Sequence, residues 1–486
     1  MSGVTLPYGF ARRQGVLLRQ ADAGLSCLHR ADADIEALLE MQRLHGPALR
    51  FETLDDGPFD SAVAAEYRDS GSQALDLAGT EDLAALADSA AAADDLLDSR
   101  DDSPVIRLIN ALLLQAVREG ASDIHIETQD RRLIVRFRVD GVLRDIVEPK
   151  RALAPLLASR IKVMARLDIA EKRVPQDGRV TLRVGGYDID VRVSTIPTQH
   201  GERVVMRLLD RGATGLDLAG LGMNARDIAA FTRLLDRPNG IVLVTGPTGS
   251  GKTTTLYTAL THLNDRKRNI MTVEDPIEYE LAGIGQTQVN NRTGLTFARG
   301  LRAILRQDPD VIMVGEIRDQ ETAEVAVRSS MTGHFVLSTL HTNSAVGAVT
   351  RLIDMGVERY LLAPMIVGLI AQRLVRRLCP HCRWQDRSTE ADSAMLGGAL
   401  KPGKKIWRAG HCEQCHGEGY GGRMGLYEVV VPDDQMRKLV HDGASEARLT
   451  EAARAAGPSL LDDGIAKLRE GLTTVDEVAR VVQEDR

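Results

Sequence analysis

Gly246-Pro-Thr-Gly-Ser-Gly-Lys-Thr253 is the stretch of this sequence that decides the fold. It fits the phosphate-binding P-loop pattern G-x-x-x-x-G-K-[ST] at every specified position. The pattern requires a strand before the loop and a helix after it, and the chain offers both: an apolar run over 241–245 and a helix-like run that starts at Thr253. We therefore expect a nucleoside triphosphate to bind here.

The residue types in this loop suit the binding of phosphate. The three glycines allow the backbone to curl so that successive N–H groups point at the anion. Lys252 adds a positive charge for the β- and γ-phosphates, and the hydroxyl of Thr253 is expected to ligate Mg²⁺. A glycine-rich turn without a ligand is the alternative, but it does not explain the Lys-Thr pair. The predicted nucleotide-binding residues are Gly246, Pro247, Thr248, Gly249, Ser250, Gly251, Lys252, Thr253 and Thr254.

Length and composition indicate a soluble protein of several domains. The 486 residues exceed the roughly 250–300 at which a single core stops growing. Aromatic residues make up only 3%, which leaves few platforms for stacking nucleic-acid bases. The longest uncharged apolar run has 12 residues, Tyr360 to Ala371, and is too short to span a bilayer. Because the N-terminus also lacks the apolar centre of a signal peptide, we expect a cytoplasmic protein that reaches a membrane only through partners or its surface.

Charge divides the first part of the chain. Residues 76–102 contain nine acidic residues and one arginine, a net charge of −8, whereas the whole chain carries −7. This composition predicts a solvated linker at 76–103, with an exposed acidic helix as the alternative. Before the linker we place a small N-terminal domain, 1–75, in which residues 32–44 have helical periodicity.

The next domain, 104–212, is predicted to be α+β and basic. An amphipathic helix begins at Pro104, and residues 133–139 and 187–193 alternate like half-buried strands. Basic residues occupy positions that the pattern predicts to be exposed: Arg136, Arg138, Arg144, Arg160, Lys162, Arg166, Lys172, Arg173 and Arg179.

Short apolar runs alternate with helix signals in the domain that holds the P-loop, 213–377. Strands are expected at 241–245, 270–273, 311–314 and 335–340. Such alternation predicts an α/β fold with a doubly wound, mostly parallel sheet, in which ligands bind at the carboxyl ends of the strands.

Polar residues that could act on a phosphate flank the other strands. Gly315 stands where a Walker B strand usually ends in Asp, so Glu316 is the first available carboxylate, to contact the metal through water or to polarise the attacking water. Glu278 is the competing general base. His341 ends one apolar strand and His334 precedes it, so both are candidates for sensing the γ-phosphate, although isolated histidines are as often core or surface residues.

Four of the five cysteines fall in a region, 378–430, that we interpret as a metal module. Cys379-x-x-Cys382 and Cys412-x-x-Cys415 form two pairs separated by 29 residues. Four thiolates would close a tetrahedral Zn²⁺ site, so the metal would be structural. Alternative ligands are His381, His411 and His416, and disulfides are the alternative chemistry. Cys27 is left as a free thiol, and residues 431–486 are predicted to be helical.

Together these residues resemble the secretion ATPase superfamily that drives type II secretion and type IV pili. The similarity rests on residues 301–319 and 332–343, on Ser122-Asp-Ile-His-Ile-Glu127 and 175–179 upstream, and on the cysteine pairs. It implies a RecA-like core that uses ATP and Mg²⁺, a zinc module, and homo-hexamers in which the basic domain of one subunit closes over the nucleotide of its neighbour. By this resemblance Arg192, Arg203 and Arg207 are candidate arginine fingers; otherwise they would be interpreted as solvated pairs.

Within the superfamily, Arg107-Leu-Ile-Asn110 and residues 168–173 most resemble the type II secretion E component. That resemblance implies a motor for pseudopilus assembly that docks on an inner-membrane L component and acts on the F component. A pilus extension motor is the close alternative. A nucleic-acid translocase and a scaffold that binds ATP without useful turnover are alternatives of other classes, although no nucleic acid is expected.

Overall fold

The computed structural model describes residues 14–21, 24–46, 49–55, 57–59, 62, 83–84, 86–87, 104–184, 187–210 and 217–483. The chain separates into two compact units, Met1–Arg211 and Gly212–Arg486. The predicted acidic linker lies outside the described residues except for four positions. Within the described ranges, no helix is both long and apolar enough to cross a membrane.

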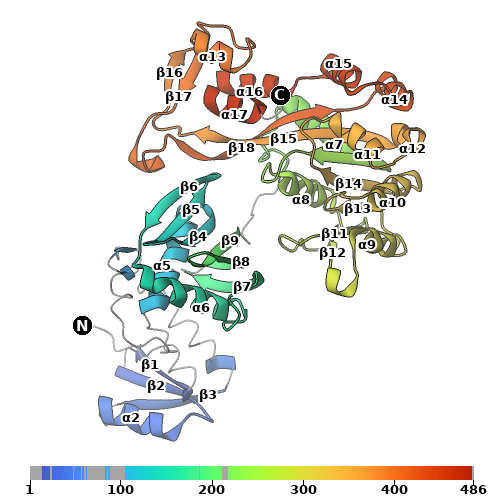
Figure 1. Cartoon of the computed structure of the whole chain (residues 1–486). Helices are drawn as coiled ribbons and strands as arrows, with labels where there is room; N and C mark the ends of the chain where they lie inside the picture. The colour runs from blue at the N-terminus through green and yellow to red at the C-terminus, as the bar shows by residue number, and fades with distance from the viewer. Residues whose placement is uncertain are drawn as a thin grey trace. The chain divides into compact units, whose positions relative to one another are not determined.

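The N-terminal elements form a small sheet covered by one helix (Figure 1). Strand β1 (Val16–Ala21) pairs antiparallel with β2 (Gly24–Arg30), which pairs parallel with β3 (Arg50–Leu54). Helix α2 (Ile35–His45) confirms the helix predicted at 32–44. Its Ala37 and Met41 pack in a core with Cys27. Burial raises the pKa of the Cys27 thiol to about 11, as expected for a free thiol inside a core.

The second group of elements is a six-stranded antiparallel sheet with two helices on one face, which confirms the predicted α+β character. The strand order is β6-β5-β4-β9-β8-β7. The strands are β4 (Ala121–Thr128), β5 (Leu133–Val139), β6 (Val142–Val147), β7 (Gln176–Val184), β8 (Tyr187–Thr198) and β9 (Gly201–Asp210), and the helices are α5 (Pro104–Arg118) and α6 (Ala154–Met164). One face of each strand meets these helices in a shared apolar core.

The prediction that Lys162 is exposed was wrong. The residue lies on α6 and is fully buried, where its Nζ pairs with Glu202 and donates a hydrogen bond to the carbonyl of Glu171 at 2.8 Å. A buried ammonium is tolerated only with such partners. Helical periodicity could not reveal this, because the carboxylate that neutralises Lys162 belongs to Glu202 on another element.

The second unit contains a seven-stranded sheet of order β12-β11-β13-β14-β10-β15-β18. The strands are β10 (Gly240–Thr245), β11 (Ile270–Glu274), β12 (Gly285–Gln288), β13 (Val311–Val314), β14 (Phe335–Leu340), β15 (Ile366–Leu378) and β18 (Tyr420–Val430). All pairs are parallel except β15 with β18. The four predicted strands are confirmed, and three further strands complete the sheet.

Helices cover both faces of this sheet, so the predicted doubly wound α/β architecture is confirmed (Figure 1). One apolar core joins α7 (Ala225–Leu235) and α8 (Lys252–Leu263) to Val242 and Val244 of β10. The alternate residues of β10, Ile241 and Leu243, face the opposite core. That core contains residues of α9 (Phe297–Ile304), α10 (Gln320–Met331), α11 (Gly347–Asp354) and α12 (Arg359–Met365).

The last elements confirm the predicted helical C-terminus. They are α14 (Asp434–His441), α15 (Glu446–Ala456), α16 (Leu460–Arg469) and α17 (Val475–Gln483). The cysteine-containing region before them holds β16 (Trp384–Arg387), α13 (Glu390–Met395) and β17 (Lys405–Arg408). Leu400 and Ile406 of the cysteine-containing region pack with Leu468 and Val478 of the last two helices. The cysteine region is therefore tied to the helices that follow it.

Candidate active site

The carboxyl ends of the parallel strands bring together the P-loop, Glu316, Glu278 and His341, which the sequence predicted for phosphate chemistry. In the strand register, Thr245 lies beside Leu340 on one side and beside Ala371 on the other. The residues that follow these positions therefore share one edge. Because strands lie about 4.8 Å apart, the end of β14 is next to the P-loop, while β13 and β11 end about 10 and 14 Å from it.

The P-loop depends on glycine at two crowded positions. Gly246 has φ 148° and Gly251 has φ 88°. A Cβ on Gly246 would lie 2.4 Å from the carbonyl oxygen of Gln372, and one on Gly251 would lie 2.8 Å from its side-chain Nε2. Both contacts are too close for a side chain, so the loop is packed directly on β15. Thr253 and Thr254, at the start of α8, are exposed and available to a ligand.

Lys252 is a buried cation held by the loop itself. Its Nζ donates hydrogen bonds to the carbonyls of Gly246 at 2.7 Å and Pro247 at 2.9 Å. Burial lowers the pKa of Lys252 to about 8; Glu316 opposes this shift and Arg373 adds to it. A nearby phosphate would favour the charged ammonium, so the side chain is suited to an anionic ligand.

This pKa predicts that nucleotide binding takes up a proton at alkaline pH. In the free protein the ammonium loses its proton above about pH 8, and bound phosphate raises the pKa again. At about pH 8.5, ADP binding should therefore consume roughly 0.7 proton per site. Calorimetry in two buffers of different ionisation enthalpy measures this number. The variant Lys252→Arg, which stays charged, should show no uptake; equal heats in both buffers for the natural chain would contradict the prediction.

Glu316 lies where it can act on the nucleotide. It follows β13 with a side chain 15% exposed, and Arg318 donates to its Oε1. His341 follows β14, and its Nε2 is 3.4 Å from Oε2 of the same carboxylate. Glu316 is also close enough to raise the pKa of Lys252. The structure thus brings Glu316, His341 and the P-loop lysine together.

The region around Glu278 is organised by Tyr257 of α8. The tyrosine hydroxyl donates to Glu274 and accepts from the backbone N–H of Glu278 at 3.2 Å. Burial, followed by the bond to Glu274, raises the pKa of Tyr257. Glu274 is itself buried and also accepts from Thr272 and Gln286, so it has a structural role. Glu278 is half-buried on the same edge, after a strand that ends farther from the P-loop than β13.

His334 does not join this group. It precedes β14, at the amino end of the strand, roughly 20 Å along the strand from His341. Its Nδ1 lies 2.9 Å from the carbonyl of Ser329 and 3.1 Å from the hydroxyl of Thr332, at the end of α10. Within one subunit, the two histidines therefore lie at opposite ends of β14.

Two residues of β15 that the sequence analysis missed support the P-loop. Gln372 and Arg373 are 1% and 2% exposed. The side-chain oxygen of Gln372 accepts from Thr255 at 2.7 Å, and Arg373 donates from Nη2 to the carbonyl of Asn343 at 3.0 Å. They join the loop after His341 to the nucleotide loop. A Gln-Arg pair inside the apolar run 366–375 was the signal in the sequence.

The predicted arginine fingers share one face of the six-stranded sheet. Arg192 of β8 is paired in register with Arg207 of β9, and Arg203 lies four residues earlier on β9. Val204 and Met206, which alternate with them on β9, point to the opposite, helix-covered face. All three guanidinium groups therefore belong to the face that the helices leave uncovered.

The four cysteines of the two pairs meet as predicted. Their sulfurs all lie within 4.8 Å of one another, and the Cys379–Cys412 and Cys382–Cys415 distances are 3.8 and 3.7 Å. A tetrahedron with Zn–S bonds of about 2.3 Å has sulfurs about 3.8 Å apart. None of the three neighbouring histidines, all within the described region, belongs to this cluster. The thiols are free, so the geometry fits zinc and does not fit disulfides.

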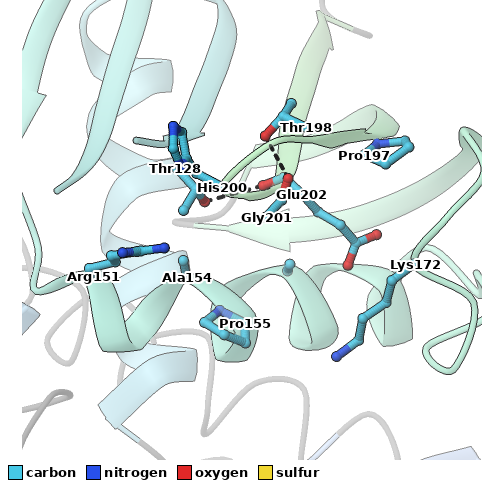
Figure 2. Close-up of a pocket in the computed structure, with 11 residues that line it drawn as sticks. Thr128, Arg151, Ala154, Pro155, Lys172, Pro197, Thr198, His200, Gly201 and Glu202 are labelled. Atoms are coloured by element: carbon cyan, nitrogen blue, oxygen red, sulfur yellow. Dashed lines mark hydrogen bonds between the residues drawn. The ribbon is translucent and has the colours of Figure 1, made fainter. Parts of the chain in front are cut away.

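A cavity of about 260 Å³ lies elsewhere, in the six-stranded domain, between the first turn of α6 and the β8–β9 turn (Figure 2). Its hydroxyls are engaged within the protein: Thr198 donates to the carbonyl of Gly201 at 2.6 Å and Thr128 to that of Glu202 at 3.3 Å. The Glu202 carboxylate is paired with buried Lys162. The cavity is also smaller than the roughly 300–1,000 Å³ of typical ligand pockets, so we assign it no ligand.

The chain is similar to known proteins over nearly its whole length. The model of the "Type II/IV secretion system protein" family matches residues 98–480, and that of an N-terminal domain of "GSPII protein E" matches residues 5–67. Type II secretion system protein E of Pseudomonas aeruginosa is 58% identical over 484 residues, which cover 99% of this chain and 96% of that protein. Type II secretion system ATPase E of Vibrio cholerae is 52% identical over 486 residues, covering 99% and 97%.

Solved structures agree with the architecture. The crystal structure of the pilus retraction motor PilT with bound ADP aligns with a TM-score of 0.54 and 27% identity, over 77% of this chain and 96% of that one. The ATPase DotB of Legionella pneumophila aligns with a TM-score of 0.58 and 22% identity, over 77% and 95%, which shows a shared fold.

Proposed function

The chain belongs to the type II secretion E-protein family of secretion ATPases, and from this premise we propose that it is the Mg²⁺-dependent motor of a type II secretion system. In this proposal a homo-hexamer couples ATP hydrolysis to pseudopilus assembly and to the export of folded proteins. The observation that carries it is the similarity over 99% of the chain, which includes the N-terminal domain as well as the ATPase core. That domain would dock on the cytoplasmic part of an L-type inner-membrane component, and the motor would act on an F-type platform protein.

The residues at the carboxyl ends of the parallel strands would have different roles in catalysis. The P-loop N–H groups and Lys252 would hold the β- and γ-phosphates. Mg²⁺, held by the hydroxyl of Thr253, would neutralise charge on the phosphates. Glu316 is our candidate for polarising the attacking water, because His341 and Arg318 contact its two oxygens and it lies near Lys252. Glu278 remains the second candidate, since it lies on the same edge.

Arginines from a neighbouring subunit would complete the site. The face with Arg192, Arg203 and Arg207 offers the positive charge that a phosphoryl-transfer transition state needs. Supplying one such finger typically raises kcat about 10³–10⁵-fold, so closure of the interface could control hydrolysis. The type II motor would then remain in the cytoplasm and attach to the inner membrane through its partners.

Complementation of a strain that lacks the gene tests this function. The natural chain should restore a secreted protein to the culture medium, whereas Glu316→Gln should not, because phosphoryl transfer would lose its carboxylate. Glu324→Gln, which makes the same change in α10 at a side chain that accepts a hydrogen bond from exposed Gln320, is the matched control and should restore secretion. Restoration of surface pili in place of secretion would favour the pilus extension alternative. Turnover that DNA stimulates, with a steep salt dependence, would favour the nucleic-acid motor.

A further inference from the structure

The sheet face that carries the three candidate fingers also carries acidic residues that hold two of them. Asp123 and Glu127 lie on β4 at alternate positions, so both side chains point to the same face as the arginines. In the register Asp123 is directly opposite Arg207. The acids are nearly buried, with side chains 6% and 12% exposed.

Asp123 holds Arg207 by one nitrogen only. Its Oδ1 accepts a hydrogen bond from Nε of Arg207 at 2.9 Å. Its Oδ2 accepts from the hydroxyl of Ser122 at 2.8 Å, which fixes the carboxylate. Among the described residues, no hydrogen bond engages the two Nη groups of Arg207, and this side chain is 60% exposed. The guanidinium is thus fixed in orientation while its outer edge faces solvent.

Arg203 is held through an Nη group, whereas Arg207 is held through Nε. Its Nη2 donates to Oε1 of Glu127 at 2.7 Å and lies 3.3 Å from Nδ1 of His125. The two oxygens of Glu127 also accept from Arg136, both at 2.8 Å. One of the two Nη groups of Arg203 is therefore already used within its own domain, and the side chain is only 36% exposed.

We propose that Asp123 is a positioning residue that aims Arg207 at the phosphates of nucleotide bound to a second copy of this chain. Arg207, and not Arg203, then makes the contact with the transferring phosphoryl group, through the two Nη groups that suit bidentate recognition of phosphate. Fixing the guanidinium beforehand removes rotational freedom that would otherwise be lost during the reaction. This inference rests on the proposed function, because the finger needs a neighbour's nucleotide.

Steady-state ATP hydrolysis by the full-length hexamer tests the proposal. Arg207→Ala should lower kcat by about 10²-fold or more. Asp123→Ala should lower kcat about tenfold and leave the KM for ATP within about twofold, because Asp123 orients the finger and is not part of the P-loop. Asp123→Asn should recover most of the rate, because its side-chain oxygen can still accept from Nε. Asp123→Ser, too short to reach Nε, replaces the alanine variant if that variant does not assemble.

Asp190→Ala is the matched control. Asp190 is 1% exposed on β8 and pairs with Arg179 on the same sheet, but Arg179 is not a candidate finger. This variant should keep the natural rate, and light scattering should give one size for all assemblies. An unchanged rate for Arg207→Ala would overturn the finger assignment in the proposed function. A large loss for Arg207→Ala with none for Asp123→Ala, or equal losses for Asp123→Ala and Asp190→Ala, would overturn the role of Asp123 alone.

Discussion

Lys252→Ala should abolish ATP hydrolysis and secretion without unfolding the protein. The variant lacks the only cation that the P-loop pattern itself supplies to the β- and γ-phosphates, so kcat should fall by at least about 10³-fold. The fold should persist because Nζ is hydrogen-bonded to two neutral loop carbonyls, so its loss leaves no buried charge unpaired. Phosphate release and thermal unfolding measure the two quantities.

The sign of the stability change follows from the lowered pKa of Lys252. Since that pKa lies below the value in an unfolded chain, the unfolded state binds more protons between about pH 8 and pH 10.5, and burial of the charged group opposes folding below this window. The alanine variant should therefore melt at the same or a higher temperature at neutral pH. Lys267→Ala, which deletes an exposed lysine after α8, should leave hydrolysis unchanged. Secretion that continues in Lys252→Ala without turnover would contradict the motor function.

Removal of the metal from the four-cysteine cluster should unfold the segment around it and slow hydrolysis. Structural zinc contributes about 10–16 kcal/mol to the folding of small zinc-binding peptides, so its loss should destabilise the segment next to the four sulfurs. Hydrolysis should slow because β15 runs from Gln372 and Arg373, which support the P-loop, to the cysteine cluster. The backbone N–H of Leu378 donates to the carbonyl of Leu472 at 2.9 Å, and that of Arg376 donates to Glu477 at 2.9 Å.

Cys412→Ser tests this prediction. It should lose bound zinc, melt at a lower temperature and hydrolyse ATP roughly tenfold more slowly, since Gln372 and Arg373 would lose part of their support. Cys27→Ser is the control: it alters the remaining cysteine, which lies in the N-terminal core, and should keep one zinc per chain. Elemental analysis measures the metal. Less than about half an equivalent in natural protein from zinc-supplemented cells would contradict the zinc assignment.

Local signals predicted the elements that carry the site. The P-loop, the four parallel strands and the cysteine pairs can each be recognised from a few neighbouring residues. Phosphate binding, burial on both faces of a sheet and metal ligation each require particular residue types at fixed spacing. Glu316 could be proposed for the same reason, as the first acid after a buried strand. The cysteine sulfurs then met at the distances that such spacing implies.

Long-range packing explains what the sequence pattern did not reveal. Lys162 was expected at the surface and is buried because Glu202, 40 residues later, neutralises it. His334 and His341 flank the same strand, β14, and lie at its opposite ends, so the length of the strand separates them. Gln372 and Arg373 lie within an apolar run, β15, and they reach the P-loop because β15 is the neighbour of β10 in the sheet. A local sequence pattern does not contain the order of the strands.

The identity of the ligand thus followed from a contiguous motif, since a loop that wraps phosphate must be built from neighbouring residues. The roles that we propose for the arginines depend on pairing between strands. Arg203 and Arg207 are four residues apart on one strand and look equivalent in the sequence. Glu127 nevertheless engages one Nη group of Arg203, whereas Asp123 binds Arg207 through Nε and leaves both of its Nη groups unengaged among the described residues. That difference arises because hydrogen bonds between residues about 80 positions apart form only when β4 pairs with β9.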